Sequence, residues 1–436
     1  MMGLGGRSCD ILASLCRAIR SVSIALLTLL SMRIVLLGIA AIPFIYYGIA
    51  LFSCLRYFLT AKLVVNDFAP PVSNLKPVRG LDPEAYENFA SFCRQDYPNY
   101  EILFCIGDTH DPAYPLLERL QSEFPDTKIR ILIGSNRIAA NDKVTKLARM
   151  VDEASFEHLV ISDSDVRVEP NYLRRLVAPL KDKKVGAVTC FYVPTEEKGF
   201  VQRLQDVGML SDFYPGILVA KQLDGVKFAL GPTICTTKTN LAEWGGYPAI
   251  ENMPGDDLLV GRSIAERGHE VVLLPYAIDT VPDFQSLREL FMKRLRWLTV
   301  MRHMRTQGHA GLVFTLGLPW TLLAMAIAPT ATIAAAYAGG YLLVRWLLTL
   351  LVGVKGLKQP GVWANLALVP VWDALATVIW LVSFTRRSIR WRGHDYRIVN
   401  GNLVPVRPEE VLRAQEKAAA LAAEQALHAH KSPGEL

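Results

Sequence analysis

The sequence contains little cysteine, and none of it stands in a metal-binding pattern. Seven of the 436 residues are cysteine, and they form no C-x-x-C pair and no other spacing typical of metal ligands. The chain also lacks a G-x-G-x-x-G segment after a strand-like run, which is the dinucleotide fingerprint of many oxidoreductases. We therefore expect reduced cysteines that mostly fill the core, and an oxidoreductase is a weak interpretation.

Charge is scarce as well, and it is not gathered on a soluble face. Charged residues make up 20% of the chain, and the formal net charge is +6. The basic residues cluster beside apolar segments instead of alternating with aromatic residues on a polar surface. This arrangement favours anionic lipid as a partner and argues against nucleic acid.

Apolar residues are abundant, and near the N-terminus they form a long run. They make up 51% of the chain, and the mean hydropathy is +0.24, which is high for a soluble domain. The uncharged run Ile34 to Leu55 exceeds the roughly 20 helical residues needed to cross a bilayer. No small-residue cleavage site follows the shorter run Ser21 to Met32, so we predict a membrane anchor, not a secretory signal.

A second apolar region lies towards the C-terminus. Gly311 to Val344 carries no charge, Trp346 to Val354 continues after the single Arg345, and Gly361 to Phe384 contains only Asp373. Lengths of this kind predict about three apolar segments that enter the membrane.

Between these regions, strand-like and helix-like runs alternate. This order predicts an α/β domain with a mainly parallel sheet and helices on both faces. The predicted strands are Leu75 to Val78, Tyr100 to Gly107, Lys128 to Ile133, His158 to Ser162, Val185 to Val193 and Glu270 to Asp279. The predicted helices are Pro83 to Arg94, Pro112 to Glu123, Lys143 to Val151, Pro170 to Leu180 and Leu258 to Arg267.

Acidic residues follow two of the predicted strands. Asp108 closes the second strand, and Asp163-Ser164-Asp165 closes the fourth. Ligands of such sheets bind outside the carboxyl ends of the strands. Two carboxylates that point the same way can hold a hard divalent cation against a diphosphate. The alternative is a solvated acidic turn.

Two further positions carry charge at predicted helix starts. Lys143 is electrostatically unfavourable at a helix N-terminus unless an anion is near, and a diphosphate would supply one. A solvated surface lysine is the alternative. Asp256 and Asp257 head the helix Leu258 to Arg267, where they either cap it or supply a general base to an acceptor hydroxyl.

An amphipathic helix is predicted over Gln285 to Arg305, directly before the C-terminal apolar region. A helix of this kind usually lies in the membrane interface. Lys293 and Arg296 stand one turn apart on it, with Trp297 beside them. Basic side chains that extend towards water beside an interfacial aromatic residue are the structural alternative to a catalytic role.

Taken in order, these motifs resemble the D, D, D, (Q/R)-x-x-R-W signature of membrane-bound inverting glycosyltransferases. Within that superfamily the chain is similar to the ceramide glucosyltransferases and to related bacterial lipid glycosyltransferases, including those that glycosylate hopanoids. The resemblance extends from about Val64 to about Val406. Further landmarks are Leu75-Lys-Pro-Val-Arg-Gly80, Gln95-Asp-Tyr-Pro98, Asp111-Pro112, Asn141 with Lys143, Gly245-Gly246, Trp391-Arg-Gly393 and Tyr396-Arg397.

The resemblance implies a GT-A-like fold and assigns the donor side of a site. Asp108 would contact the nucleoside of a UDP-sugar. Asp163 and Asp165 would meet the diphosphate through Mg²⁺ or Mn²⁺, and Lys143 would neutralise the leaving diphosphate.

It also assigns the acceptor side, with two departures from the family pattern. Asp257 would be the base, while Arg296 and Trp297 would close over donor and acceptor. Lys293 stands where the family usually has Gln or Arg, so a point charge replaces a fork of donors. Asp256 stands where Glu is common, which leaves the choice of base between two aspartates, and motif register favours Asp257.

We therefore expect an inverting enzyme that moves a hexose from a UDP-sugar to the hydroxyl of a membrane lipid. Ceramide-like sphingolipid is the first choice of acceptor and a hopanoid the second. A processive polysaccharide synthase shares the signature but usually has more membrane spans. A non-catalytic scaffold or transporter would not explain the three acidic sites. A transporter also needs charged residues that line a path through the membrane, and only Arg345 and Asp373 could do so here.

The expected organisation has five parts. They are an N-terminal segment with an anchor (1–58), a catalytic domain (59–284), an interface helix (285–309), a C-terminal membrane region (310–385) and a basic segment with a helical tail (386–436). We expect a multi-pass protein with a cytosolic catalytic domain, in a bacterial inner membrane. The basic residues 386, 387, 390, 392 and 397 should also be cytosolic. Three full crossings would put the catalytic domain and the basic residues on opposite sides of the membrane. One of the C-terminal segments should therefore be re-entrant or interfacial.

Overall fold

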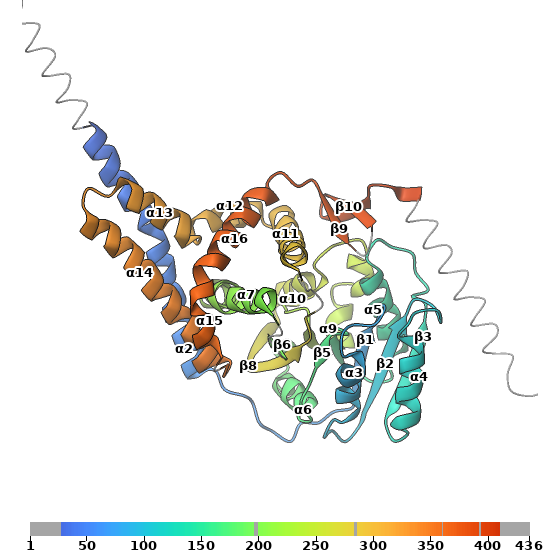
Figure 1. The fold of residues 1–436 in the computed structure, drawn as a ribbon. Coiled ribbons are helices and arrows are strands. Elements are labelled where there is room, and N and C mark those ends of the chain that lie inside the picture. Colours follow the sequence, from blue (N-terminus) through green and yellow to red (C-terminus); the bar gives the residue numbers. More distant parts are fainter. Residues whose placement is uncertain (1–27, 196–198, 283–285, 360, 392–393, 410–436) are drawn as a thin grey trace, which may run out of the picture.

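The computed structural model describes residues 28–195, 199–282, 286–359, 361–391 and 394–409. A group of long apolar helices lies on one side of the molecule, and an α/β unit lies on the other (Figure 1). The helical tail predicted within residues 386–436 falls almost entirely outside the described residues.

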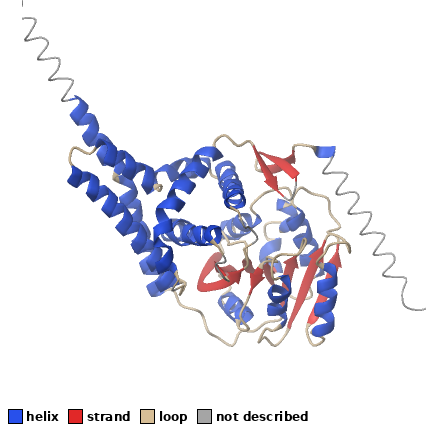
Figure 2. Ribbon diagram, in the orientation of Figure 1, coloured by secondary structure: helices blue, strands red, loops and turns tan. Residues whose placement is uncertain are grey.

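The α/β unit contains an eight-stranded sheet in the order β3-β2-β1-β4-β7-β6-β8-β5 (red in Figure 2). Neighbours β3-β2, β2-β1, β1-β4 and β6-β8 are parallel, whereas the pairings of β7 with β4 and β6 and of β5 with β8 are antiparallel. The predicted, mainly parallel sheet is confirmed. The strands are β1 Val72–Pro77, β2 Tyr100–Ile106, β3 Lys128–Ile133, β4 His158–Ser162, β5 Val166–Arg167, β6 Val185–Pro194, β7 Thr233–Thr237 and β8 Glu270–Thr280.

Helices cover both faces of this sheet because its strands bury alternate side chains on opposite sides. Leu103 and Phe104 are neighbours in β2, yet they belong to two different hydrophobic cores. This is the two-residue period expected of a strand that is buried on both faces. The helices of this unit include α3 Ala85–Cys93, α4 Tyr114–Glu123, α5 Asp142–Glu153, α6 Tyr172–Val177, α9 Lys238–Ala242 and α10 Asp256–Glu266.

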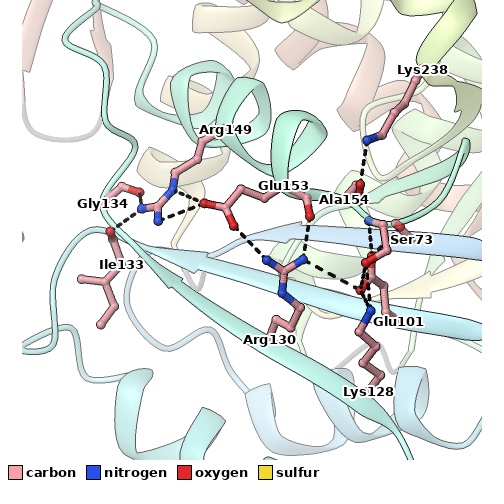
Figure 3. Close-up of polar contacts among 11 residues, drawn as sticks. Ser73, Glu101, Lys128, Arg130, Ile133, Gly134, Arg149, Glu153, Ala154 and Lys238 are labelled. Carbon is pink, nitrogen blue, oxygen red and sulfur yellow. Dashed lines mark hydrogen bonds and ion pairs between the residues drawn. The ribbon is translucent and has the colours of Figure 1, made fainter. Parts of the chain in front are cut away.

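A buried carboxylate fixes the end of the sheet where β2 begins (Figure 3). Glu101 is fully buried; it forms an ion pair with Lys128 at 2.8 Å and accepts hydrogen bonds from the Ser73 hydroxyl and from the Ser155 amide and hydroxyl. Burial acts to raise the pKa of Glu101, but Lys128 and the hydrogen bonds hold it below its ordinary value. A satisfied buried network of this kind rigidifies the sheet. The opposite end of the sheet, where β2 ends, is the end at which such sheets bind their ligands.

The apolar helices partly follow the sequence-based expectation. Three described helices are long and apolar enough to cross a membrane, namely Thr28–Thr60, Ala331–Gly356 and Val362–Ser383, and a bent pair, Thr306–Phe314 with Gly317–Ile327, could form a fourth. The three predicted C-terminal segments are thus present. Their division differs, because the break falls at Ala328 to Thr330 and not at Arg345. The elements are α2 Ile42–Thr60, α12 Thr306–Gly311, α13 Gly317–Ile327, α14 Ala331–Leu350, α15 Val362–Asn365 and α16 Val369–Ser383.

The cysteines that the structure describes are free and buried. They are Cys54, Cys93, Cys105, Cys190 and Cys235, and burial raises the pKa of the four that lie outside the apolar helices. Thiols of this kind are unreactive. The expectation of reduced, core-filling cysteines is therefore confirmed for these five residues.

After the apolar helices the chain forms a second, three-stranded sheet that the sequence analysis did not anticipate. Its strands are β9 Ser388–Trp391, β10 His394–Val399 and β11 Asn402–Pro405. The buried face of this C-terminal sheet packs against Ala140 and Val300, and the Leu403 amide donates to the Asn252 carbonyl at 2.6 Å. Residues from beyond the apolar region therefore help to hold two loops of the α/β unit, before α5 and before α10.

Candidate functional site

The first functional side chains meet at the start of α5. The Asn141 side chain caps this helix by accepting from the Val144 amide at 3.3 Å, and its amide group donates to the Met253 carbonyl at 2.9 Å. These two contacts join the loop before α5 to the loop before α10. The next turn of α5 therefore lies beside the start of α10.

Lys143 connects both of the predicted acidic sites. Its ammonium group lies 2.7 Å from Asp163 Oδ1 and 3.2 Å from Asp256 Oδ2. Burial alone would lower the pKa of Lys143, but the two carboxylates raise it above its ordinary value. The expectation that this lysine needs a nearby anion is met by two aspartates. A diphosphate bound here would compete with them for its charge.

Asp257 lies beside this cluster in an environment that favours proton uptake. Burial, together with the negative charge of Asp256, raises the pKa of Asp257 to about 6. One carboxylate oxygen accepts from the Leu258 amide at 2.8 Å, and the other faces Gly231, where a Cβ atom would stand 3.1 Å from it. A carboxyl group whose pKa lies near the working pH is suited to general base catalysis.

Lys76, which lies in one of the landmark segments, is a site residue to which the sequence analysis assigned no role. It is completely buried in β1, donates to the Asp163 carbonyl at 2.8 Å, and lies 3.6 Å from the ring centre of Phe92. Burial lowers the pKa of Lys76 to about 7, although Asp163 and Asp165 act to raise it. The available signal was a lysine inside the strand-like run Leu75 to Val78. A charge at such a position needs a specific partner.

The two aspartates of the D-x-D segment offer carboxylate oxygens that a cation arriving with a ligand could use. Among the described residues, no group of three or more His, Cys, Asp or Glu side chains forms a complete metal site. Mg²⁺ bound to a nucleotide typically uses one or two protein carboxylates and completes its shell with phosphate oxygens and water. The Asp163 side chain, which is 32% exposed, and Asp165 provide hard oxygen donors of this type. The residues present therefore fit a divalent cation shared with a diphosphate.

Asp108 lies in a neighbouring loop of the same sheet edge. Its carboxylate accepts from the His110 amide at 2.8 Å and lies 3.7 Å from the His110 ring. The turn after Asp108 is held in place, because the Asp111 carboxylate accepts a hydrogen bond from the Gly80 amide at 3.0 Å. Strand β1 lies between β2 and β4, so Asp108 and the D-x-D segment flank the end of β1. No described contact joins them directly.

The predicted amphipathic helix is present as α11, Leu287–Met304. Its first turn is fixed by a capping box between Ser286 and Glu289. Of the predicted helix, only the first residue, Gln285, lies outside the described residues. Helix α11 packs against the start of α10, because Val300 and Met304 lie within 4 Å of a Cβ atom built on Gly255. The helix therefore borders the two aspartates that begin α10.

The basic residues of α11 are not equivalent. Lys293 and Arg296 are half-buried and make polar contacts, whereas Arg294 is only 7% exposed and its guanidinium group lies 4.7 Å from the ring centre of Trp297. Trp297 also packs against Phe213, with ring centres 6.0 Å apart. The sequence analysis assigned no role to Arg294, because a basic residue in an amphipathic helix gives no sign of which face is buried.

These groups together offer a donor side and an acceptor side. Lys143 can engage an anionic leaving group directly, Asp163 and Asp165 could do so only through a divalent cation, and Asp257 can accept a proton beside them. Both sides act on the Tyr192 hydroxyl: burial raises its pKa, the charge of Arg294 opposes this, and the charges of Asp257 and Asp165 add to it. The arrangement can therefore support a displacement in which a hydroxyl is deprotonated opposite a departing diphosphate.

Comparisons with known proteins bear on the family and the fold of the chain. The family model described as "Glycosyl transferase family 21" matches residues 35–404. A curated relative, ceramide glucosyltransferase 3 of Caenorhabditis elegans, is 24% identical over 249 residues, which are 56% of this chain and 53% of that protein. The ceramide glucosyltransferase of Gibberella zeae is 32% identical over 165 residues, 36% of this chain and 30% of that protein. The matches thus span about half the length of these relatives or less.

A solved structure shows the same fold. A mannosyltransferase from Pyrobaculum calidifontis, in complex with GDP-Man and Mn²⁺, superposes with a TM-score of 0.55 at 19% sequence identity. The match covers 79% of this chain and 99% of that one. At this identity the likeness concerns the fold, and it confirms the GT-A-like architecture that the sequence predicted.

Proposed function

The chain belongs to glycosyl transferase family 21, and we propose that it moves a hexose from a UDP-sugar to the hydroxyl of a ceramide-like membrane lipid. UDP-glucose is the proposed donor. The names of the ceramide glucosyltransferase relatives support a glucosyl group and a ceramide acceptor, and the apolar helices beside the site support an acceptor held in a bilayer. The proposed location is a membrane, bacterial inner membrane first, with the site on the cytosolic side.

The observation that carries the proposal is a carboxylate with a raised pKa close to Lys143 and the D-x-D segment. Asp257 has a pKa raised to about 6 and shares the charge of Lys143 with the D-x-D segment. An acceptor hydroxyl that attacks a sugar must lose its proton as the new bond forms. Asp257 would take that proton, and the sugar would be transferred with inversion.

The leaving diphosphate needs positive charge on the opposite side. Lys143 would supply part of it once a donor draws its ammonium group away from Asp163 and Asp256. Asp163 and Asp165 would hold a divalent cation, Mg²⁺ or Mn²⁺, which supplies Lewis-acid stabilisation of the diphosphate when bound. Lys76 would keep the backbone of the D-x-D segment in place from below, through its hydrogen bond to the Asp163 carbonyl.

The remaining assignments concern binding and closure. Asp108 would contact the nucleoside at the end of β2. Lys293, Arg296 and Trp297 would close over donor and acceptor from α11, whose last turns contact the loop before Asp256. The partly exposed Trp297 ring would help exclude water from the bound acceptor hydroxyl.

Mass spectrometry of lipids tests the proposed reaction directly. The purified chain would be placed in nanodiscs that contain ceramide or a hopanoid, and each sample would receive UDP-glucose, UDP-galactose or UDP-N-acetylglucosamine. We expect a hexosylated ceramide from UDP-glucose and none from the Asp257→Asn variant. A product formed only on the hopanoid would show that the acceptor is a hopanoid and not ceramide. No product on either lipid would refute lipid glycosylation.

The pH dependence of turnover should report the base. Asp257 must be ionised to accept a proton, so kcat/KM, which reports groups of the free enzyme, should fall as the pH drops through about 6, the pKa to which Asp257 is raised. kcat/KM would be measured between pH 5 and 8 with both substrates well below saturation, and protein folding would be checked at each pH. A rate that stays constant down to pH 5 would rule out Asp257 as the rate-determining base.

Replacement of Trp297 should separate gating from anchoring. If the ring closes the acceptor site, Trp297→Ala should reduce turnover of a long-chain lipid by about 10-fold or more while UDP-sugar affinity changes little. The measurement is turnover per correctly folded enzyme in nanodiscs. Phe291→Ala, on the same helix and also half-buried, is the matched control. Normal turnover with lower thermal stability would leave Trp297 as an interfacial anchor.

A further inference from the structure

A short π-helical segment connects the apolar helices with the acceptor side of the site. Met209–Phe213 winds as a π-helix between α7, Phe200–Gly208, and α8, Tyr214–Asp224. Such turns are rare and occur often at functional sites. Here Phe213 packs against Trp297, and the Met209 sulfur lies 2.9 Å from a guanidinium nitrogen of Arg294. Both ends of the π-helical segment therefore touch α11.

The middle of the same segment is held by a buried ion pair between two apolar helices. Arg345 of α14 and Asp373 of α16 are 3% and 5% exposed, and Arg345 Nε lies 2.9 Å from Asp373 Oδ2. A second guanidinium nitrogen contacts the other carboxylate oxygen, so the pair is bidentate. The Arg345 guanidinium also donates to the Ser211 carbonyl and, at 3.2 Å, to the Ser211 hydroxyl.

Neighbouring contacts converge on the same place. The Tyr47 ring of α2 lies 5.1 Å from the Arg345 guanidinium, and the Tyr341 hydroxyl donates to Asp373 at 2.6 Å. Trp372, next to Asp373, packs so closely against α7 that a Cβ on Gly208 would come within 2.2 Å of its ring. Helices α2, α14 and α16 thus all contribute to the position of the π-helical segment.

Stability alone is a poor explanation for this pair. Charges in a protein interior lose hydration, and a buried ion pair is often no more stabilising than apolar residues of the same volume. A rigid bidentate arginine does, however, define the distance and orientation of the groups that it joins. The bond to the Ser211 backbone then fixes the segment on which Phe213 and Met209 stand.

We propose that Arg345 and Asp373 are positioning residues for the acceptor side of the active site. They hold Ser211, and through Phe213 and Met209 they set the place of Trp297 and Arg294. The helices that meet the lipid tails are thereby joined to the residues beside the lipid head group. This inference rests on the proposed function, because it assigns Trp297 to acceptor closure.

Two variants test the positioning role and keep it apart from folding. Arg345→Lys keeps the charge pair with Asp373 but lacks the fork of donors that also reaches Ser211. The double variant Arg345→Met with Asp373→Leu removes both charges and replaces them by apolar side chains, a change that protein interiors often tolerate. Tyr341→Phe is the matched control, since it removes a bond to Asp373 and leaves the contact with Ser211 in place.

The readouts are kcat and KM for a long-chain lipid in nanodiscs, per folded enzyme, and the Kd of UDP by titration calorimetry. Misplacement of a closing residue by about 1 Å can cost on the order of 100-fold in rate. We expect both test variants to lose between about 10-fold and 100-fold in kcat/KM for the lipid, with an unchanged Kd for UDP. Tyr341→Phe should remain close to the wild type.

Either of two results would overturn the inference. One is normal lipid turnover in Arg345→Lys and in the double variant, which would leave the pair as a link between helices only. The other is an equal loss of UDP binding, which would indicate general damage. If the double variant does not fold, Arg345→Lys alone decides. A wild-type enzyme that glycosylates no lipid refutes the proposed function instead, so the two failures are distinguishable.

Discussion

Asp257→Asn is expected to abolish sugar transfer while leaving UDP-sugar binding largely intact. The amide keeps the size of the carboxylate but cannot take up a proton, and general base catalysis typically contributes about 100-fold to 10,000-fold. The residue stands on the second position of α10, next to Lys143 and the D-x-D segment. Turnover by mass spectrometry and donor affinity by calorimetry are the two measurements. Loss of donor affinity together with activity would show that Asp257 binds the donor.

Asp256→Asn is the matched control, because it changes the adjacent carboxylate in the same way. Asp256 raises the pKa of Asp257, so its replacement should lower that pKa and move the acid limb of the rate profile to lower pH. Activity at neutral pH should fall less than in Asp257→Asn, since the base is still present. If Asp256→Asn is the inactive variant instead, the base assignment passes from Asp257 to Asp256.

Chelation of divalent cations is expected to have the second largest effect. Asp163 and Asp165 supply only part of a metal shell, so the cation should bind weakly without donor and be removed readily by EDTA. Activity should disappear with EDTA and return with Mg²⁺ or Mn²⁺. Full turnover by a rigorously chelated enzyme would leave Lys143 and Arg296 as the sole source of positive charge.

A binding measurement makes the metal assignment independent of activity. Mn²⁺ binding in the presence of UDP would be followed by electron paramagnetic resonance. Asp165→Asn should weaken it, because an amide oxygen is a poorer ligand than a carboxylate for a hard cation. Asp152→Asn, on a helix of the same domain, is the control and should bind Mn²⁺ normally. Equal Mn²⁺ affinity in both variants would exclude Asp165 as a ligand.

The α/β architecture was predictable because its strands carry a clear hydrophobic pattern. All six predicted strands, including His158 to Ser162, match the structure to within three residues at either end. The two strands of this sheet that were not predicted have physical reasons. Strand β5 has only two residues, and β7 consists of Thr-Ile-Cys-Thr-Thr, whose side chains up to Thr236 are buried at the centre of the sheet. A local pattern cannot indicate burial that comes from neighbouring strands.

The candidate site was predictable where a motif marks a strand end or a helix start, as at Asp163 and Lys143. Other features arise from tertiary structure. Lys76 is buried beneath the D-x-D segment, Arg294 faces inward on α11, and the C-terminal sheet packs on the loop at Asn252. Each depends on contacts between residues far apart in the sequence. The roles assigned to these residues are proposals that the experiments above decide.

The C-terminal sheet also limits the routes that the chain can take across a membrane. Arg302, before the apolar helices, donates to the carbonyl oxygens of Phe384 and Arg386 beyond them, and Leu403 bonds to the α/β unit itself. Between these points, Gly356 and Val362 line the same cavity as Tyr276 of β8. The chain therefore leaves the α/β unit and returns to it twice. If that unit lies on one side of a membrane, each excursion must cross an even number of times, and we propose on this ground that Val362–Ser383, although long enough to span, lies along the unit without crossing.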